Sequence, residues 1–275
     1  MNRLFVTDKP SKVSSNNHLK DIKRKYGVKK AGYSGTLDPF ASGCLIVAFY
    51  QYSKLFRFLK KSPKRYKATL HLGAKSETLD VEKVEKIEDV KPFKKDEIER
   101  VLSSFVGEIE YLPPKYSAKK INGQKAYDLA RKEIDFELKK IKSTIFELSL
   151  LSYKHPFVSF SISISEGGYV RSIGNLISQK LGCEGSLSSL RRISEGNFSY
   201  DDEKGLDPLN YLKTIANRYL GDKDDILLGK KLKATDFEIC KNGEYHIVTD
   251  EYLSIIKIEN DKVGYLLNKI RLEQC

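Results

Sequence analysis

Apolar and polar positions alternate most regularly in two segments, at residues 66–72 and 158–164. Alternation with a period of two is typical of a β-strand with one buried face. Shorter segments with strand-like character follow near the end of the chain, at residues 245–249, 253–258 and 263–267, separated by polar turns. The pattern therefore predicts long strands in the main body and a small β-rich unit after them.

Helical spacing of apolar residues occurs in four other segments, and it predicts four helices. The residues that carry it are Leu19, Ile22 and Tyr26; Ile98, Val101, Leu102 and Phe105; Ile173, Leu176, Ile177 and Leu181; and Leu212, Ile215 and Tyr219. Gly182 provides a left-handed stop for the third helix, and Asp207-Pro208 a start for the fourth. Helices and strands interleave without a regular βα repeat, which favours an α+β fold with a mixed sheet over a doubly wound one.

A polar segment at residues 221–225 separates the two textures of the chain. We therefore predict a larger domain at residues 1–222 and a small β-rich domain at residues 223–275. The second is near the lower size limit for independent folding.

Positive charge is concentrated in the larger domain. The whole chain has a formal net charge of +12, whereas residues 223–275 contain nine basic and ten acidic residues. Such an excess favours a polyanionic partner, so we expect any nucleic-acid surface to lie before residue 223.

Several classes of protein are disfavoured by composition. The four cysteines, Cys44, Cys183, Cys240 and Cys275, show no metal-binding spacing, and the four histidines are scattered. We therefore expect no metal site and a reducing compartment. The chain has no run of about 18 apolar residues and no signal-like start, so we expect a cytoplasmic protein without a membrane partner.

The most unusual segment is residues 32–43, in which three glycines and a proline surround Asp38. Because Pro39 follows Asp38, a helical backbone conformation is disfavoured at Asp38, and we expect a tight loop. Taken alone, this composition favours an aspartate that hydrogen-bonds its own turn. A catalytic carboxylate is the alternative.

Five motifs, in order, resemble the TruB family of tRNA pseudouridine synthases. They are DKP with Ser14-Ser15 at residues 8–15, GTLDP at 35–39, KRY at 64–66, PPKYSA with Asn122-Gly123 at 113–123, and GYVR with LRR at 168–192. The segment after residue 222 resembles the family's PUA-like RNA-binding module. The resemblance implies a pseudouridine-synthase core with a mixed, largely antiparallel sheet flanked by helices, and an RNA-gripping insertion at about 112–143.

The resemblance also implies a reaction, the isomerisation of uridine to pseudouridine at position 55 in the T arm of tRNA, without a cofactor. It implies Asp38 as the catalytic carboxylate and Arg171 as its partner. Tyr66 would stack on the flipped base and help to move the C5 proton. For Arg171 the alternative is a surface or phosphate contact, and for Tyr66 it is a partly buried sheet aromatic.

Further substrate-binding residues follow from the same motifs: Tyr33, Tyr169, Leu190, Lys9, Lys64, Lys119 and Lys120. Leu190 would form an apolar wall for the base, although an ordinary core leucine on a helix is the alternative. Tyr33 stands where relatives carry histidine, and a flat tyrosine ring can still stack in the space that the flipped nucleotide leaves. For Lys119 and Lys120, which lie in a lysine-rich segment at residues 115–132, the alternative is a solvated helix face.

The expected partner is tRNA, with no obligatory protein partner, and the expected state is a monomer. Within enzymes, the alternative is a pseudouridine synthase that is directed by guide RNAs or acts on other RNAs. From another class, the alternative is an RNA-binding or tRNA-folding protein without catalysis.

Overall fold

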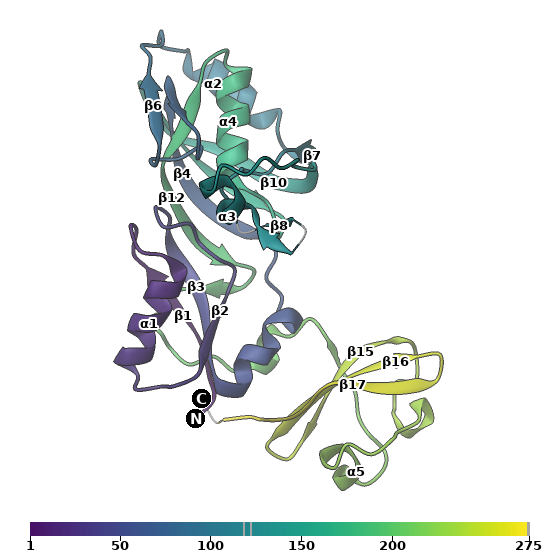
Figure 1. Cartoon of the computed structure of the whole chain (residues 1–275). Helices are drawn as coiled ribbons and strands as arrows, with labels where there is room; N and C mark the ends of the chain where they lie inside the picture. Colours follow the sequence, from purple (N-terminus) through teal and green to yellow (C-terminus); the bar gives the residue numbers. More distant parts are fainter. Residues whose placement is uncertain (118, 122, 274–275) are drawn as a thin grey trace.

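The computed structural model describes residues 1–117, 119–121 and 123–273, which form a nine-stranded sheet and a four-stranded sheet (Figure 1). The strand order of the large sheet is β1-β3-β12-β4-β11-β10-β7, with β2 added to β3 and β13 to β12. All its pairings are antiparallel except that of β3 with β12. The predicted α+β class with a mixed, largely antiparallel sheet is confirmed.

The large sheet is made of β1 (Arg3–Lys9), β2 (Ala31–Ser34), β3 (Ser42–Phe49), β4 (Lys64–Leu72), β7 (Gly107–Tyr111), β10 (Ile141–Lys154), β11 (Phe157–Ile164), β12 (Gly185–Glu195) and β13 (Phe198–Ser199). Two small antiparallel pairs join β5 (Ala74–Ser76) to β6 (Val84–Ile87) and β8 (Lys120–Ile121) to β9 (Gln124–Lys125). The α-helices are α1 (Ser15–Lys25), α2 (Lys95–Ser103), α3 (Ala126–Arg131), α4 (Val170–Lys180) and α5 (Lys223–Leu227). Short 3-10 helices are η1 (Tyr50–Phe58), η2 (Pro208–Tyr211) and η3 (Ala234–Asp236).

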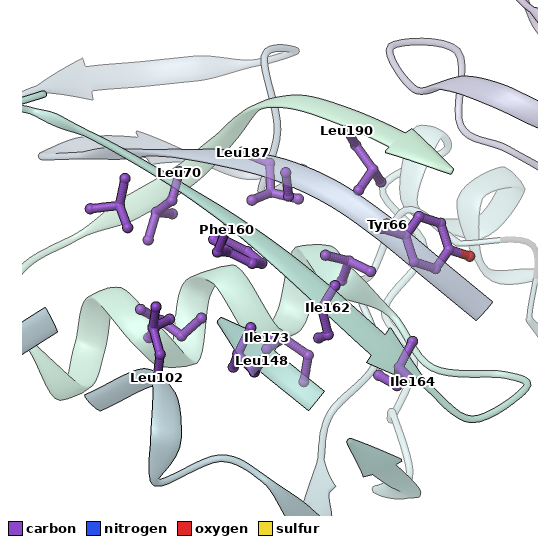
Figure 2. Packing of buried hydrophobic residues seen from close by; sticks show 14 of the residues in the cluster. Tyr66, Leu70, Leu102, Leu148, Phe160, Ile162, Ile164, Ile173, Leu187 and Leu190 are labelled. Carbon is purple, nitrogen blue, oxygen red and sulfur yellow. The ribbon is translucent and has the colours of Figure 1, made fainter. Parts of the chain in front are cut away.

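The main core lies between the sheet and two helices, α2 and α4, that pack together on one face of it (Figure 1). Inward residues of β4 alternate with outward ones along the whole strand. Leu70, Phe160 and Leu187, from three adjacent strands, are fully buried in this core. Figure 2 shows Tyr66 at one end of the cluster, with its hydroxyl pointing away from the apolar side chains. Tyr66 therefore packs at the edge of this core.

Three of the four predicted helices are present as α1, α2 and α4, and Gly182 follows α4 with a φ of 80°. The fourth prediction was wrong, because Asp207-Pro208 starts only the short 3-10 helix η2. Downstream, Leu212 forms a β-bridge with Leu59, and Ile215 pairs with Tyr245 in the second sheet. Tertiary strand pairing thus overrides a helical spacing.

The second sheet contains β14 (Ile215–Ala216), β15 (Gly243–Thr249), β16 (Tyr252–Glu259) and β17 (Lys262–Arg271), in that order. It is the predicted β-rich C-terminal module. Because β14 comes from before residue 222, the exact boundary between the two domains stays a prediction.

One apolar cluster joins the second sheet to the first strands of the chain. Leu253, Ile255 and Ile270 pack in it with Leu4 and Val6, and all five are buried. The Asn2 backbone N–H donates to Glu273 Oε1 at 3.0 Å, so β1 and the segment after β17 lie close together. The C-terminal module is therefore packed against the start of the main sheet.

Candidate active site

The loop that carries Asp38 connects β2 to β3, and it is anchored on both sides of the aspartate. Ser15 Oγ, in the first turn of α1, accepts from the Leu37 N–H at 3.0 Å and lies 2.9 Å from the Leu37 carbonyl. The side chains of Leu37 and Phe40 are buried in the main core. Between them the Asp38 carboxylate is 34% exposed. The loop is thus fixed while its carboxylate stays accessible.

Arg171, in the first turn of α4, holds that carboxylate. Its Nε lies 2.9 Å from Asp38 Oδ2, and its side chain is only 4% exposed. Nη1 donates to the Thr78 carbonyl at 2.7 Å, and Nη2 to the Tyr116 carbonyl at 2.8 Å. With its other nitrogens engaged in this way, the guanidinium presents Nε to Asp38 in one orientation, a rigidity that planar arginine provides and lysine does not.

A second carboxylate, Asp80, shares this arginine and was not predicted from the sequence. Its Oδ2 lies 3.3 Å from Arg171 Nη1, while its Oδ1 accepts from Thr78 Oγ1 at 2.6 Å and from the Glu82 N–H at 2.9 Å. Burial raises the pKa of Asp80, and the bond from Thr78 and the charge of Arg171 oppose that rise. Asp80 lies in the connection between β5 and β6, where no motif distinguishes it from an ordinary turn aspartate.

A pocket of about 280 Å³ opens beside the Asp38–Arg171 pair. Seven of the predicted site residues line it: Asp38, Lys64, Tyr66, Lys119, Tyr169, Arg171 and Leu190. The other lining residues are Gly35, Thr36, Leu37, Gly167, Gly168, Val170 and Arg192. Segments far apart in the sequence thus meet at one hollow that holds a carboxylate, two aromatic rings and several cations.

Tyr66 and Leu190 form part of the pocket wall from neighbouring strands. Leu190 lies on β12, where it pairs with Ala68 of β4, so the alternative of a helical core leucine was wrong about the element. Burial raises the pKa of Tyr66, and the neighbouring Arg192 guanidinium opposes that rise. At neutral pH Tyr66 therefore carries a phenol that can donate a proton. Burial likewise raises the pKa of Tyr169, which stands at the start of α4.

Three predicted substrate-binding residues lie outside the pocket lining. Lys9 is fully buried behind the Asp38 loop, where its ammonium donates to the carbonyls of Pro10, Val13 and Pro39 at 2.8, 2.6 and 3.4 Å. Tyr33 lies in β2 and donates from its hydroxyl to Asn16 Oδ1 at 3.0 Å. Lys120 is exposed in β8. Lys9 thus braces the loop, and the substrate contacts of these residues stay predictions.

Two residues with no predicted role lie beneath the loop. Arg192 belongs to the LRR motif. It donates from Nη2 to the Gly35 carbonyl and from Nε to the Cys44 carbonyl, each at 2.7 Å. Glu195 is fully buried and lies 3.3 Å from Lys64 Nζ and 3.4 Å from Arg192 Nη1. A charged residue three positions after another in a strand gives no signal in the sequence, because regular alternation would place the two on opposite faces.

The predicted RNA-gripping insertion contains β8, β9 and α3, and Lys119 brings it to the pocket. Two residues of its motif, Ala118 and Asn122, lie outside the described residues, as does Cys275. The role of the insertion in RNA binding stays a prediction.

In the described ranges, no three or more His, Cys, Asp or Glu side chains gather where they could hold a metal ion. No helix in the same part of the chain is long and apolar enough to cross a membrane.

Comparison with known proteins gives a consistent result. Residues 23–170 match the family model described as TruB family pseudouridylate synthase, N-terminal domain. A tRNA pseudouridine synthase B of Sulfurovum sp. (strain NBC37-1) is 53% identical over 98% of each chain, and that of Campylobacter curvus (strain 525.92) is 51% identical over the whole of both chains. The fold is similar to that of a chain in a solved Cbf5-Nop10-Gar1 complex, with a TM-score of 0.67 and 22% identity over 98% of this chain and 84% of the other.

Proposed function

The chain belongs to the TruB family of pseudouridylate synthases, and on that basis we propose that it modifies the uridine at position 55 in the T arm of tRNA. Conversion of uridine to pseudouridine in tRNA follows from the family and from full-length relatives that are named tRNA pseudouridine synthase B. The T arm and the roles of individual residues are the finer part of the proposal.

The reaction is an isomerisation that needs no redox change. The bond between N1 of uracil and C1′ of ribose breaks, the base turns, and a bond forms between C5 and C1′. C5 then loses its proton and N1 gains one, so atoms and electrons balance without an external group. The protein must supply a placed carboxylate, a group that moves the C5 proton, and a site shielded from water.

Asp38 is proposed as the carboxylate. The observation that carries this role is the 2.9 Å contact of Arg171 Nε with Asp38 Oδ2, which orients an accessible carboxylate at the mouth of the pocket. Two routes fit this placement, addition of the carboxylate to C1′ and removal of a ribose proton. Both need the ionised form of the carboxylate.

Tyr66 is proposed to stack on the flipped uracil and to help transfer the C5 proton. A uridine inside a folded arm must leave its stack before a protein group can reach its glycosidic bond. The aromatic ring of Tyr66 and the apolar side chain of Leu190 line one pocket with Asp38, which provides a surface for the extruded base. Lys64 and Lys119 line the same pocket; Lys119 would supply positive charge for the RNA backbone, whereas the Lys64 ammonium is paired with the buried Glu195.

We propose further that the protein acts as a monomer in the cytoplasm, with tRNA and no obligatory protein partner. The scattered cysteines and the net charge of +12 support this setting. A monomeric mass in analytical ultracentrifugation, unchanged during turnover, is the expected result.

Tritium release tests the chemistry and the position together. Minimal T-arm hairpins would carry [5-³H]uridine only at position 55 or only at another loop uridine. Wild-type protein should release tritium from the first hairpin alone, and Asp38→Asn should bind both but release none, because an amide is neither nucleophile nor base. Release from the second hairpin would reject position 55 as the sole target. Multiple turnover by Asp38→Asn would remove Asp38 from the proposed role, and tight binding without release by the wild type would favour a non-catalytic RNA-binding protein.

A further inference from the structure

A buried charge cluster of three side chains lies beneath the Asp38 loop: Lys64, Arg192 and Glu195. Glu195 Oε1 lies 3.3 Å from Lys64 Nζ, and Glu195 Oε2 lies 3.4 Å from Arg192 Nη1. The Glu195 side chain is 0% exposed. Among the described residues, neither of its oxygens accepts a hydrogen bond of good geometry. Burying a carboxylate in this way costs free energy, which attraction to two cations offsets only in part when the oxygens lack hydrogen bonds.

A β-bulge in β12 turns Glu195 inward. Arg192 pairs with Tyr66 and Glu195 with Lys64, but Ser194 pairs with Arg65, so Ile193 is the extra residue. Such a bulge shifts the alternation by one, which places residues three apart on the same face. Arg192 and Glu195 are accordingly both buried, while Ile193 is exposed. The cluster therefore depends on one irregularity at the end of a strand.

The cluster is in direct contact with the loop that carries Asp38. Gly35 has a φ of 69°, and a Cβ atom added to it would lie 2.6 Å from Glu195 Oε2 and 3.1 Å from Arg192 Nη1. Arg192 Nη2 also donates to the Gly35 carbonyl at 2.7 Å. Glu195 and Arg192 thus contact the loop at Gly35, which is three residues before Asp38.

The cluster also surrounds the end of β4 that bears Tyr66. Lys64 and Tyr66 face the same side of β4, each opposite a member of the cluster on β12. The positive charge of Arg192 lowers the pKa of the Tyr66 phenol, and the negative charge of Glu195 raises it. Asp38, from the loop above, acts in the same direction as Glu195. Without Glu195, Tyr66 would face Arg192 and Lys64 with less opposing charge.

We infer that Glu195 is a positioning residue for the isomerisation: it holds Lys64 and Arg192 in place and keeps Gly35 and Tyr66 in the arrangement that Asp38 requires. Its kinetic consequences rest on the proposed function, whereas its effect on Tyr66 does not. Glu195 does not line the pocket, so it acts through its neighbours.

The first test follows the Tyr66 phenol directly. Protein labelled with ¹³Cζ-tyrosine would be titrated by NMR, with the Tyr66 signal assigned from Tyr66→Phe. Glu195→Gln should lower the pKa of Tyr66, and adding Lys64→Gln should raise it again, because one of the two cations is removed. Glu203→Gln is the matched control, since Glu203 is another buried carboxylate paired with a lysine, Lys25, away from the pocket.

The second test is kinetic. Glu195→Gln should lower kcat by about tenfold or more with KM changed by less than about twofold, because an interaction needed for the reaction is lost while RNA binding is kept. Glu195→Asp, which keeps the charge but withdraws it from Gly35, should give a smaller loss. Glu203→Gln should leave kcat unchanged.

The inference would be overturned if the Tyr66 titration in Glu195→Gln matched that of the wild type. It would also be overturned if the kcat values of Glu195→Gln and Glu203→Gln both fell in proportion to their loss of thermal stability. Should Glu195→Gln fail to fold, Glu195→Asp is measured instead, and a kcat equal to that of the wild type would overturn the inference. A wild-type protein that forms no pseudouridine would reject the proposed function alone, since the titration of Tyr66 would still support or reject the positioning role.

Discussion

At the scale of single residues, the Arg171 guanidinium joins parts of the chain that have no contact in sequence. It binds Asp38 from one loop, Asp80 from another, and carbonyls of Thr78 and Tyr116. Removing one partner from such a buried network leaves the others uncompensated, which typically costs about 3–5 kcal/mol. The Asp38 carboxylate, proposed as catalytic, is therefore placed by a network that also stabilises the fold.

The motif resemblance implies a histidine at the position of Tyr33, and we expect the Tyr33 ring to stack in the space left by the flipped nucleotide. Base–aromatic stacking contributes on the order of 1–3 kcal/mol, or roughly five- to hundredfold in rate. Tyr33→Ala should therefore slow modification of folded tRNA by about that factor, and a destabilised T-arm hairpin much less. Single-turnover rates on the two substrates measure the difference.

Tyr33→Phe and Tyr33→His are the controls for that test. Tyr33→Phe loses only the bond from the hydroxyl to Asn16, so it should keep most activity. If phenylalanine is as damaging as alanine on both substrates, the hydroxyl matters and stacking is the wrong explanation.

Lys9 gives the protein a pH dependence of stability with a defined sign. Burial lowers the pKa of Lys9 from 10.5 to about 8, and the charge of Asp38 opposes that change. Between these two pH values the unfolded chain binds more protons than the folded one, so unfolding becomes harder as pH rises. The free energy of unfolding of the wild type, minus that of Lys9→Met, should therefore rise from pH 8 to 10.5 in urea titrations. A difference that falls with pH would mean that the three carbonyls outweigh burial.

At the scale of elements, the Asp38 loop and the end of β12 fit together closely at Gly35. Gly35 and Gly27 both have left-handed backbone, with φ of 69° and 62°, but Gly27 has no atom within 4 Å of an added Cβ. Alanine in that conformation costs roughly 1–2 kcal/mol at either site. Gly35→Ala should in addition displace Glu195 and lower kcat by about tenfold or more.

Urea unfolding and steady-state kinetics on both glycine variants separate the two effects. Gly27→Ala should lose stability and keep its kcat. Equal kcat values for the two variants would show that the close fit at Gly35 has no effect on catalysis.

Regular elements could be predicted from the sequence, and irregular ones could not. Inward positions of β4 and α4 follow the expected periods because each packs one face on the core. The bulge at Ile193 has no such periodic signal, and Glu195 was missed with it. Asp80 was missed because its importance arises from contact with Arg171, far along the chain. The motifs, by contrast, led to seven of the residues that line the pocket.

At the scale of the whole molecule, the distribution of charge separates the two sheets. The excess of positive charge lies before residue 223, in the part that contains the pocket and the lysine-rich insertion. Phosphate contacts by lysine and arginine release counterions, so RNA affinity should fall steeply with salt.

Neutralising Lys119, Lys120 and Lys125 to alanine should weaken tRNA binding and flatten its salt dependence. Each lost phosphate contact reduces the slope of log affinity against log salt by about 0.7–0.9, so the combined change should be about two to three. Fluorescence anisotropy at several salt concentrations measures it. Alanine at Lys75, Lys86 and Lys95, which each pair with a surface glutamate, is the charge-matched control. Identical slopes for the two triple variants would make the segment a merely solvated surface.

The packing of the second sheet against the first strands has a consequence for synthesis on the ribosome. Leu4 and Val6 are synthesised long before Leu253, Ile255 and Ile270, which pack with them in one cluster. During elongation the growing polypeptide therefore leaves part of the apolar surface of Leu4 and Val6 uncovered until β16 and β17 emerge, and a chaperone that binds apolar segments would find a target there during that interval.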